Sequence, residues 1–182
     1  MPLGWNAEVF LSMKSAFLLL LLTLSVAGGI KRTGDDDATV PYPEGYRHWT
    51  FLHASAVPPA LPGFWTRPCV KPCTAGIFYF YANDKAMTGL QTGQYADGSV
   101  LTEEMLEWLG KESGSGKEGQ RRVVGVMVKD SKRYSSTGGW GYGTFDGDSK
   151  QDLLDAAGRK TCYTCHIPRK DHDYVFSQYH ER

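Results

Sequence analysis

Hydrophobic and polar positions change their spacing several times along the chain, and the changes predict several short elements. Residues 75–83, AGIFYFYAN, are dense in aromatic side chains, which favours a largely buried strand. Residues 121–130, RRVVGVMVKD, hold a run of apolar and glycine positions bounded by charges, which also predicts a buried strand. In residues 137–145, TGGWGYGTF, glycine alternates with aromatic residues, as in a strand pressed against a flat group or another backbone. We therefore expect three strands in these segments.

Helical spacing appears in three other segments. Residues 43–55 begin with proline and place aromatic residues and a histidine three and four positions apart, which predicts a short amphipathic helix. A second short helix is expected after the first strand, because Asn83 or Asp84 can cap it and Gly93 can end it. Residues 149–160 predict a third helix, with a serine as its cap and a glycine as its stop, leading to the last two cysteines.

The remaining segments are less regular. Residues 99–108 follow an Asp-Gly turn and are ambiguous, since Leu101 and Met105 fall at helical spacing; taken alone, the pattern favours a helix. Residues 111–120, KESGSGKEGQ, predict a flexible connection. Residues 56–73 contain five prolines, which exclude a regular element.

The N-terminus carries the features of a secretory signal peptide over residues 1–27. Lys14 precedes an apolar run, residues 16–24, that is short for a membrane span. The residues before Met13 do not fit this pattern, so Met13 is a candidate for the true start. We expect a cleaved signal and a periplasmic or secreted protein, although an uncleaved signal would tether it to a membrane. Residues 28–42 combine acidic residues with proline and predict a flexible lead-in.

Composition changes this picture little. The chain has 182 residues, 41% of them hydrophobic, with a formal net charge of zero, so one ordinary globular domain is expected over residues 43–182. Balanced charge gives no electrostatic reason to expect a nucleic-acid partner. The four cysteines matter more, because in an exported protein they favour disulfides over zinc sites.

The stretch KTCYTCHIPRK contains the clearest chemical motif, CxxCH. Cys162 and Cys165 lie three residues apart, so on one helical turn both thiols can add to the vinyl groups of a haem, while His166 binds the iron on the proximal side. The expected cofactor is one haem c per chain. A thioredoxin-like redox pair, or a zinc site that also uses Cys69 and Cys73, are the alternatives. Cys69 and Cys73 more simply form a small disulfide in the proline-rich loop.

The group opposite the proximal histidine decides the function of such a haem. A methionine or histidine there makes an electron carrier, whereas an empty apolar pocket makes a ligand binder or an enzyme. No segment stands out as supplying this ligand, which favours an open site. The candidate ligands in the sequence are Met87, Met105, Met127, His48, His53, His172 and His180.

Six segments in order carry a family resemblance: YPEGYRHW, YANDKAM, TGQYADGSV, VVGVMVKDSKRY, TGGWGYGTF and CYTCHIPRKDHDYVFSQY. Over residues 42–180 the chain resembles the cytochrome P-460 family, which includes the β-sheet form of cytochrome c prime. The resemblance implies an α+β fold that is mainly an antiparallel β-sheet with a few short helices. It also implies a homodimer, one c-type haem on the C-terminal CxxCH, and a strand in place of the helix over residues 99–108.

Two activities are known in this family, and one residue type separates them. One branch oxidises hydroxylamine with a haem that a lysine cross-links, and the other binds nitric oxide and carbon monoxide in an apolar pocket. This chain has Leu90 and Gln91 near the position of that lysine, and Lys85 is the nearest lysine. The expectation is therefore an open site for nitric oxide or other small nitrogen or diatomic ligands. A hydroxylamine oxidase and a simple electron-transfer cytochrome with an unknown redox partner are the alternatives.

Aromatic residues are the candidates for the haem pocket. Strand alternation turns either Phe78 and Phe80 or Tyr79 and Tyr81 inward, and packing in the core is the simpler interpretation of either pair. If Phe78 or Phe80 covers the iron, it excludes polar ligands and admits diatomic gases. Trp140 and Tyr142 in the glycine-rich strand are further candidates.

Overall fold

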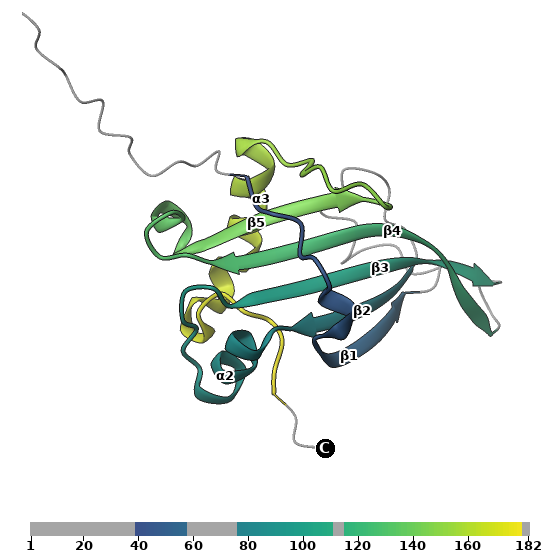
Figure 1. The fold of residues 1–182 in the computed structure, drawn as a ribbon, viewed down its shortest axis with the longest axis horizontal. Coiled ribbons are helices and arrows are strands. Elements are labelled where there is room, and N and C mark those ends of the chain that lie inside the picture. Colours follow the sequence, from purple (N-terminus) through teal and green to yellow (C-terminus); the bar gives the residue numbers. More distant parts are fainter. Residues whose placement is uncertain (1–38, 58–75, 111–114, 180–182) are drawn as a thin grey trace, which may run out of the picture. The chain divides into compact units, whose positions relative to one another are not determined.

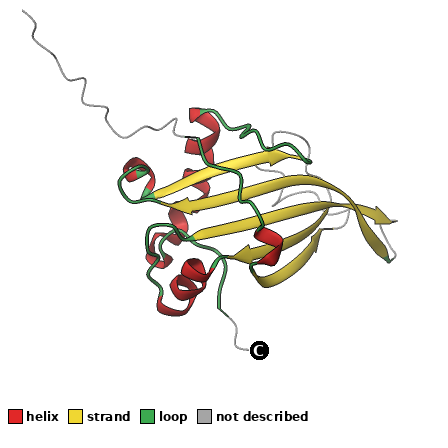
Figure 2. Ribbon diagram, in the orientation of Figure 1, coloured by secondary structure: helices red, strands yellow, loops and turns green. Residues whose placement is uncertain are grey.

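An antiparallel sheet forms the centre of the part of the chain that the computed structural model describes, residues 39–57, 76–110 and 115–179. Its five strands lie in sequence order, so each strand pairs with the next one along the chain (Figure 1). The strands are β1 (Thr50–Val57), β2 (Gly76–Ala82), β3 (Val100–Gly110), β4 (Gly116–Lys129) and β5 (Trp140–Asp146). The expected α+β fold, mainly an antiparallel sheet with a few short helices, is confirmed (Figure 2).

The strands predicted from hydrophobic runs are β2, the second half of β4, and β5. The ambiguous residues 99–108 lie in β3, so their helical spacing was misleading and the resemblance to the family was right. Leu101 and Met105 are buried on one face of β3, while Thr102 and Glu104 are buried on the other. Burial on both faces removes the alternation that normally identifies a strand.

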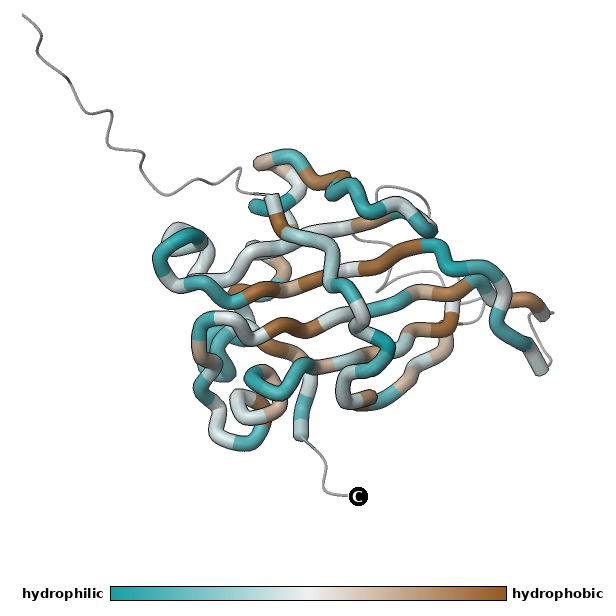
Figure 3. Tube along the Cα trace, viewed as in Figure 1, coloured by the Kyte–Doolittle hydropathy of each residue, from teal (hydrophilic) through white to brown (hydrophobic). Residues whose placement is uncertain are grey.

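The sheet has two covered faces. We call the first the helix face, because α2 (Asp84–Thr92) and α3 (Ala156–His166) pack on it around a cluster that includes Leu101 and Tyr142. We call the second the N-terminal face, because residues 40–49 pack on it around Val124, Val126 and Phe145. In Figure 1 the segment before β1 passes in front of the sheet and α3 runs behind it. Figure 3 shows hydrophobic residues concentrated along the central strands.

Helix α2 begins and ends at the residues that the sequence indicates. The side chain of Asn83 accepts a hydrogen bond from the Ala86 amide at 2.9 Å, which satisfies one of the free donors at the helix start. Gly93 ends the helix with a left-handed φ of 77°, a conformation that glycine adopts without steric cost.

Helix α3 begins later than predicted. Its N-cap is Asp155, whose side chain accepts from the Gly158 amide at 2.8 Å, so the cap expected at Ser149 and the stop expected at Gly158 are both wrong. The reason is Asp152, whose Oδ1 accepts from the Thr144 amide of β5 at 3.1 Å and holds the preceding segment extended against the sheet. Arg159 then reaches back from α3 and pairs with Asp152 at 2.5 Å, which anchors the helix to β5.

Two other local expectations are corrected by strand pairing. The helix predicted over residues 43–55 is a single 3-10 turn, Tyr46–His48, followed directly by β1, because β2 supplies hydrogen-bonding partners to residues 50–57. The connection predicted over residues 111–120 is partly strand, since β4 already starts at Gly116. A Cβ at Gly116 would lie 2.2 Å from the Trp108 ring, so glycine allows the two strands to approach.

The remaining short helices are the 3-10 turns η2 (Ser135–Thr137) and η3 (Ile167–His172), the second of which continues directly from α3. The predicted signal peptide, the proline-rich loop with Cys69 and Cys73, and His180 lie outside the described residues. Among the helices that are described, none has the length and apolar character needed to cross a bilayer.

Candidate haem site

The CxxCH residues occupy the last turns of α3. Cys162 is half-buried and packs with the cluster of the helix face, Cys165 is exposed, and both are free thiols. Burial raises the pKa of the Cys162 thiol to about 11, so it is protonated at neutral pH. His166 follows at once, and spacings of three and four residues place all three side chains on one side of the helix.

The orientation of His166 is set by the chain that follows it. Its Nδ1 lies 2.7 Å from the carbonyl oxygen of Tyr174, and since a carbonyl can only accept, Nδ1 carries the proton. Burial lowers the pKa of His166, which favours the neutral ring. Nε2 therefore keeps its lone pair and has no hydrogen-bond partner among the described residues, which is the state that a metal-binding imidazole requires.

Aromatic residues surround this imidazole. Its ring centroid lies 5.2 Å from that of Tyr142 on β5 and 4.9 Å from that of Phe176, which stands edge-on. Tyr142 is buried, and its hydroxyl has no hydrogen-bond partner in the part of the chain that is described. Burial also raises the pKa of Tyr142. A buried polar atom without a partner beside a free imidazole nitrogen fits a site that takes a further group.

The structure places the aromatic candidates on the helix face. Phe78 is buried with Val57 and Met105, and Phe80 stacks on His53 with ring centroids 4.3 Å apart. Tyr79 and Tyr81 point to the N-terminal face, where their rings contact Phe51.

Trp140 lies on the helix face too, but at its other end. It is fully buried in the cluster that contains Cys162, whereas Phe78 and Phe80 belong to a separate cluster. The sheet thus brings Phe78 and Phe80 together and keeps Trp140 beside the CxxCH helix.

Glu103 is a residue of this face that the sequence did not single out. It lies opposite Phe80 on β2 and Gly125 on β4, and it forms no hydrogen bond or ion pair with the described residues. Burial raises the pKa of this carboxyl to about 7. A Cβ at Gly125 would touch only Glu103, so the surface beside the carboxyl is open. The family resemblance predicted a strand over residues 99–108, but the sequence did not give the pairing with β2 and β4 that places Glu103 beside Phe80.

The candidate sixth ligands are spread over the molecule. His48 lies on the segment that covers the N-terminal face, and His172 is exposed beside Asp171 at 3.3 Å. On the helix face, His53 stacks on Phe80. The methionines Met87, Met105 and Met127 pack in the hydrophobic clusters.

Leu90 and Gln91, which the resemblance places near the family's cross-linking lysine, both lie on α2. Leu90 on α2 is half-buried in the cluster that contains Cys162, while Gln91 is exposed. Lys85, the nearest lysine, donates to the Asp97 carbonyl at 2.9 Å and holds the Asp-Gly turn. Lys85 therefore already has a structural partner in the loop.

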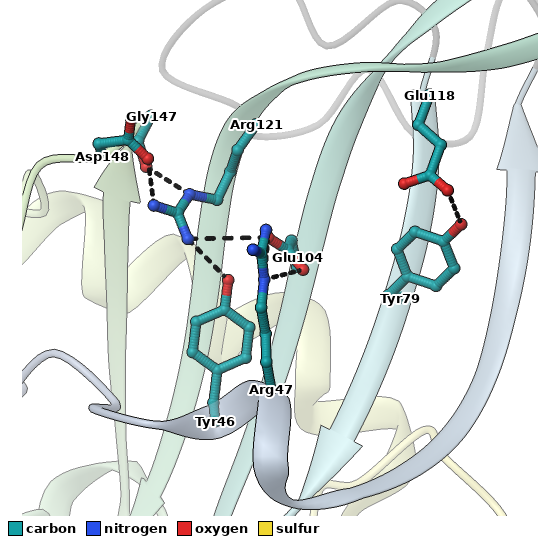
Figure 4. Close-up of polar contacts among 8 residues, drawn as sticks. All are labelled: Tyr46, Arg47, Tyr79, Glu104, Glu118, Arg121, Gly147 and Asp148. Atoms are coloured by element: carbon teal, nitrogen blue, oxygen red, sulfur yellow. Dashed lines mark hydrogen bonds and ion pairs between the residues drawn. The ribbon is translucent and has the colours of Figure 1, made fainter.

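The N-terminal face contains the other polar centre of the described chain. Buried Glu104 accepts hydrogen bonds from Arg47, and its Oε1 lies 3.7 Å from Nη1 of Arg121 (Figure 4). Arg121 also donates to the Tyr46 hydroxyl at 3.0 Å and pairs with Asp148. Because each arginine has its own carboxylate, this cluster has no spare charge for a ligand, and we interpret it as structural.

A c-type haem fits the helix face. Two free thiols, an imidazole with Nε2 available, an unpartnered buried hydroxyl and apolar strand residues such as Leu101 and Trp140 lie there. No group of three or more histidine, cysteine or acidic side chains that could hold a metal ion occurs within the described ranges, and the zinc alternative depends on cysteines outside them.

Comparison with known proteins agrees with this picture. The family model for Cytochrome P460 matches residues 43–177, which include the whole sheet and the CxxCH helix. A search of curated proteins gave no match.

Proposed function

The chain belongs to the cytochrome P460 family, whose members are c-type haem proteins, and from this premise we propose that it is an exported haem protein that binds nitric oxide or a similar small ligand. It carries one haem c per chain in this proposal. The observation that supports it best is the commitment of His166 Nδ1 to the Tyr174 carbonyl, which leaves Nε2 to the iron.

Three residues would hold the haem. Cys162 and Cys165 would each hold it through a thioether bond, made by adding the S–H across a vinyl group. His166 would bind the iron through Nε2. When bound, the haem supplies an iron centre that takes small ligands and exchanges electrons.

The side chains proposed for the other side of the haem are apolar. Phe78 is buried and Phe80 is half-buried on the helix face, and phenyl rings give neither a ligand nor a hydrogen bond. His53 and Met105, the nearest candidate ligands to them, already pack against Phe80 and Phe78. Such a surface favours uncharged diatomic molecules over water and ions.

Optical spectra of the holoprotein in the oxidised, reduced and carbon monoxide-treated states test this proposal. We expect a five-coordinate ferrous haem whose spectrum changes on addition of carbon monoxide or nitric oxide. Phe80→Ala should speed carbon monoxide association, whereas Phe51→Ala, on the other face of the sheet, should leave it unchanged. A six-coordinate low-spin ferrous haem that ignores carbon monoxide would contradict the open site and favour an electron carrier.

Glu103 favours a second candidate, oxidation of hydroxylamine or a related nitrogen compound. This reaction removes protons as well as electrons, and a carboxyl with a pKa of about 7 can accept a proton near neutral pH. An external redox partner would take the electrons. The absence of a lysine at Leu90 and Gln91 counts against this candidate.

Two measurements separate the candidates. A haem–lysine cross-link would appear in the mass of the tryptic haem peptide, because it would join a distant peptide to the C-terminal one. Hydroxylamine oxidation with a soluble dye as acceptor should fall in Glu103→Gln and not in Glu118→Gln, which changes an exposed carboxylate on the N-terminal face. If the wild type shows neither cross-link nor oxidation, ligand binding remains as the proposed function.

Export and a homodimer belong to the same proposal. The N-terminal segment supports export through its charged flank and apolar run, and the family resemblance supports the homodimer. N-terminal sequencing of the mature protein and light scattering of the holoprotein test these two points.

A further inference from the structure

The turn that follows the CxxCH helix has a strained backbone. Asp173 and Tyr174 both have left-handed φ values, 50° and 65°, and they are the only non-glycine residues in the described chain that do. This conformation is rare for a bulky aromatic residue. The turn persists only if its surroundings hold it.

An ion pair between Asp173 and Lys129, at the end of the sheet, holds this turn. Nζ of Lys129, the last residue of β4, lies 2.7 Å and 2.8 Å from the two carboxylate oxygens of Asp173, and it also donates to the Gly138 carbonyl at 3.2 Å. Nε1 of Trp140, the first residue of β5, donates to the same carboxylate at 3.3 Å. Lys129 lies 5.0 Å from the centroid of the Trp140 ring, and its side chain is only 10% exposed. We call Lys129, Trp140 and Asp173 the latch.

The latch acts on the residue next to Asp173. Tyr174 presents the carbonyl that accepts the Nδ1 proton of His166, and its ring packs so closely on Gly138 that a Cβ there would lie 2.3 Å from it. A shift of Asp173 would rotate the following peptide and move this carbonyl. The chain of contacts therefore runs from the sheet, through Asp173 and the Tyr174 carbonyl, to the imidazole.

We propose that the latch tunes the haem through its proximal ligand. By holding the Tyr174 carbonyl on Nδ1, Lys129, Trp140 and Asp173 keep His166 in one tautomer and orientation and increase the electron density on Nε2. A more basic imidazole stabilises ferric over ferrous iron and lowers the reduction potential. The three latch residues are positioning residues, and their role rests on the proposed ligation by His166.

The reduction potential of the holoprotein tests the latch. Asp173→Asn should shift the potential to more positive values and speed solvent exchange of the His166 ring N–H, because the carbonyl is no longer held. Asp171→Asn is the matched control. It removes the same charge from an exposed side chain that lies two residues before Asp173, and it should change neither the potential nor the exchange rate.

A double variant separates the effect of the latch on His166 from the direct effect of a changed charge on the potential. In Asp173→Asn alone, Lys129 keeps an unbalanced positive charge that would itself raise the potential. Lys129→Met combined with Asp173→Asn removes both charges, so the potential should stay raised if the latch acts through His166. A return of the double variant to the wild-type potential would overturn the proposal.

Trp140→Phe covers the case in which Asp173→Asn does not yield holoprotein. It removes one donor to Asp173 and should shift the potential in the same direction by less. A wild-type potential and wild-type ring N–H exchange in Trp140→Phe or in fully loaded Asp173→Asn would refute the latch. Absence of covalent haem in the wild type would instead refute the proposed function, so the two failures are distinguishable.

Discussion

Glu103 and Glu104 are neighbours on β3 that the sheet turns to opposite faces, and their surroundings differ completely. Glu104, on the N-terminal face, has a side chain only 2% exposed and is paired with Arg47 and Arg121 (Figure 4). Glu103, on the helix face, has Phe80 and Gly125 opposite it and no cationic partner in the described chain.

The fold thus pairs one carboxylate with arginines and drives the other toward its protonated form. Ion pairs offset the cost of removing the charge of Glu104 from water. For Glu103 nothing offsets this cost, so burial raises its pKa to about 7. A carboxyl that changes its charge near neutral pH, on the face that holds the CxxCH helix, is suited to proton transfer. The paired carboxylate is suited only to holding the N-terminal segment on the sheet.

The largest expected effect on stability comes from removing Glu104, the carboxylate that is paired with arginines. Glu104→Ala leaves Arg121, whose side chain is 17% exposed, without one of its two carboxylate neighbours, and it releases Arg47. We expect a loss of about 3 kcal/mol in the free energy of unfolding, at the low end for a buried pair because Arg121 keeps Asp148. Urea denaturation measures it. Glu118→Ala, an exposed carboxylate on the same face, is the control, and equal losses in the two variants would contradict our interpretation of the Glu104 cluster.

A smaller effect on stability, which depends on pH, is expected from Glu103, the carboxyl without a cationic partner in the described chain. The folded-state pKa of Glu103, about 7, is above its ordinary value of 4.5, so the contribution of Glu103 to stability is fully present below pH 4.5 and is lost as the pH rises through 7. Relative to Glu103→Gln, which does not titrate, the full shift corresponds to about 3 kcal/mol, and because Glu103 is only half-buried we expect the wild type to lose about 2 kcal/mol between pH 4 and pH 8. Thermal unfolding of both holoproteins across this range measures the difference. A difference that is constant with pH would show that Glu103 has an ordinary pKa.

Much of the architecture could be predicted from the sequence where local signals decide the structure. The aromatic run of β2, the Asn83 cap and Gly93 stop of α2, and the glycine-rich β5 all appear where the sequence indicates. A helix leading to Cys162 and Cys165 was also expected, but its predicted bounds, residues 149–160, stop short of the cysteines that α3 carries.

The parts that could not be predicted depend on contacts between distant residues. The side of the sheet on which Glu103 lies follows only from the pairing of β3 with β2 and β4. Asp173 and its partner Lys129 are 44 positions apart in the chain, and no local pattern indicates that they meet. Residues 43–55 have helical spacing, although pairing with β2 makes residues 50–55 part of a strand. In each case tertiary pairing overrode the local preference.

The smallest expected effect is an exposed contact on the same face as Glu104. The Tyr79 hydroxyl donates to Oε1 of Glu118 at 3.1 Å, and both groups are solvated (Figure 4). Because water replaces such a bond easily, Tyr79→Phe should cost about 0.5 kcal/mol. A double-mutant cycle of Tyr79→Phe with Glu118→Ala, followed by urea denaturation, should give a coupling energy no larger than that. A coupling above about 1 kcal/mol would mean that an exposed pair stabilises this sheet as much as a partly buried one. Burial would then not explain why the Glu104 pairs are expected to stabilise the protein more than the exposed contact of Glu118.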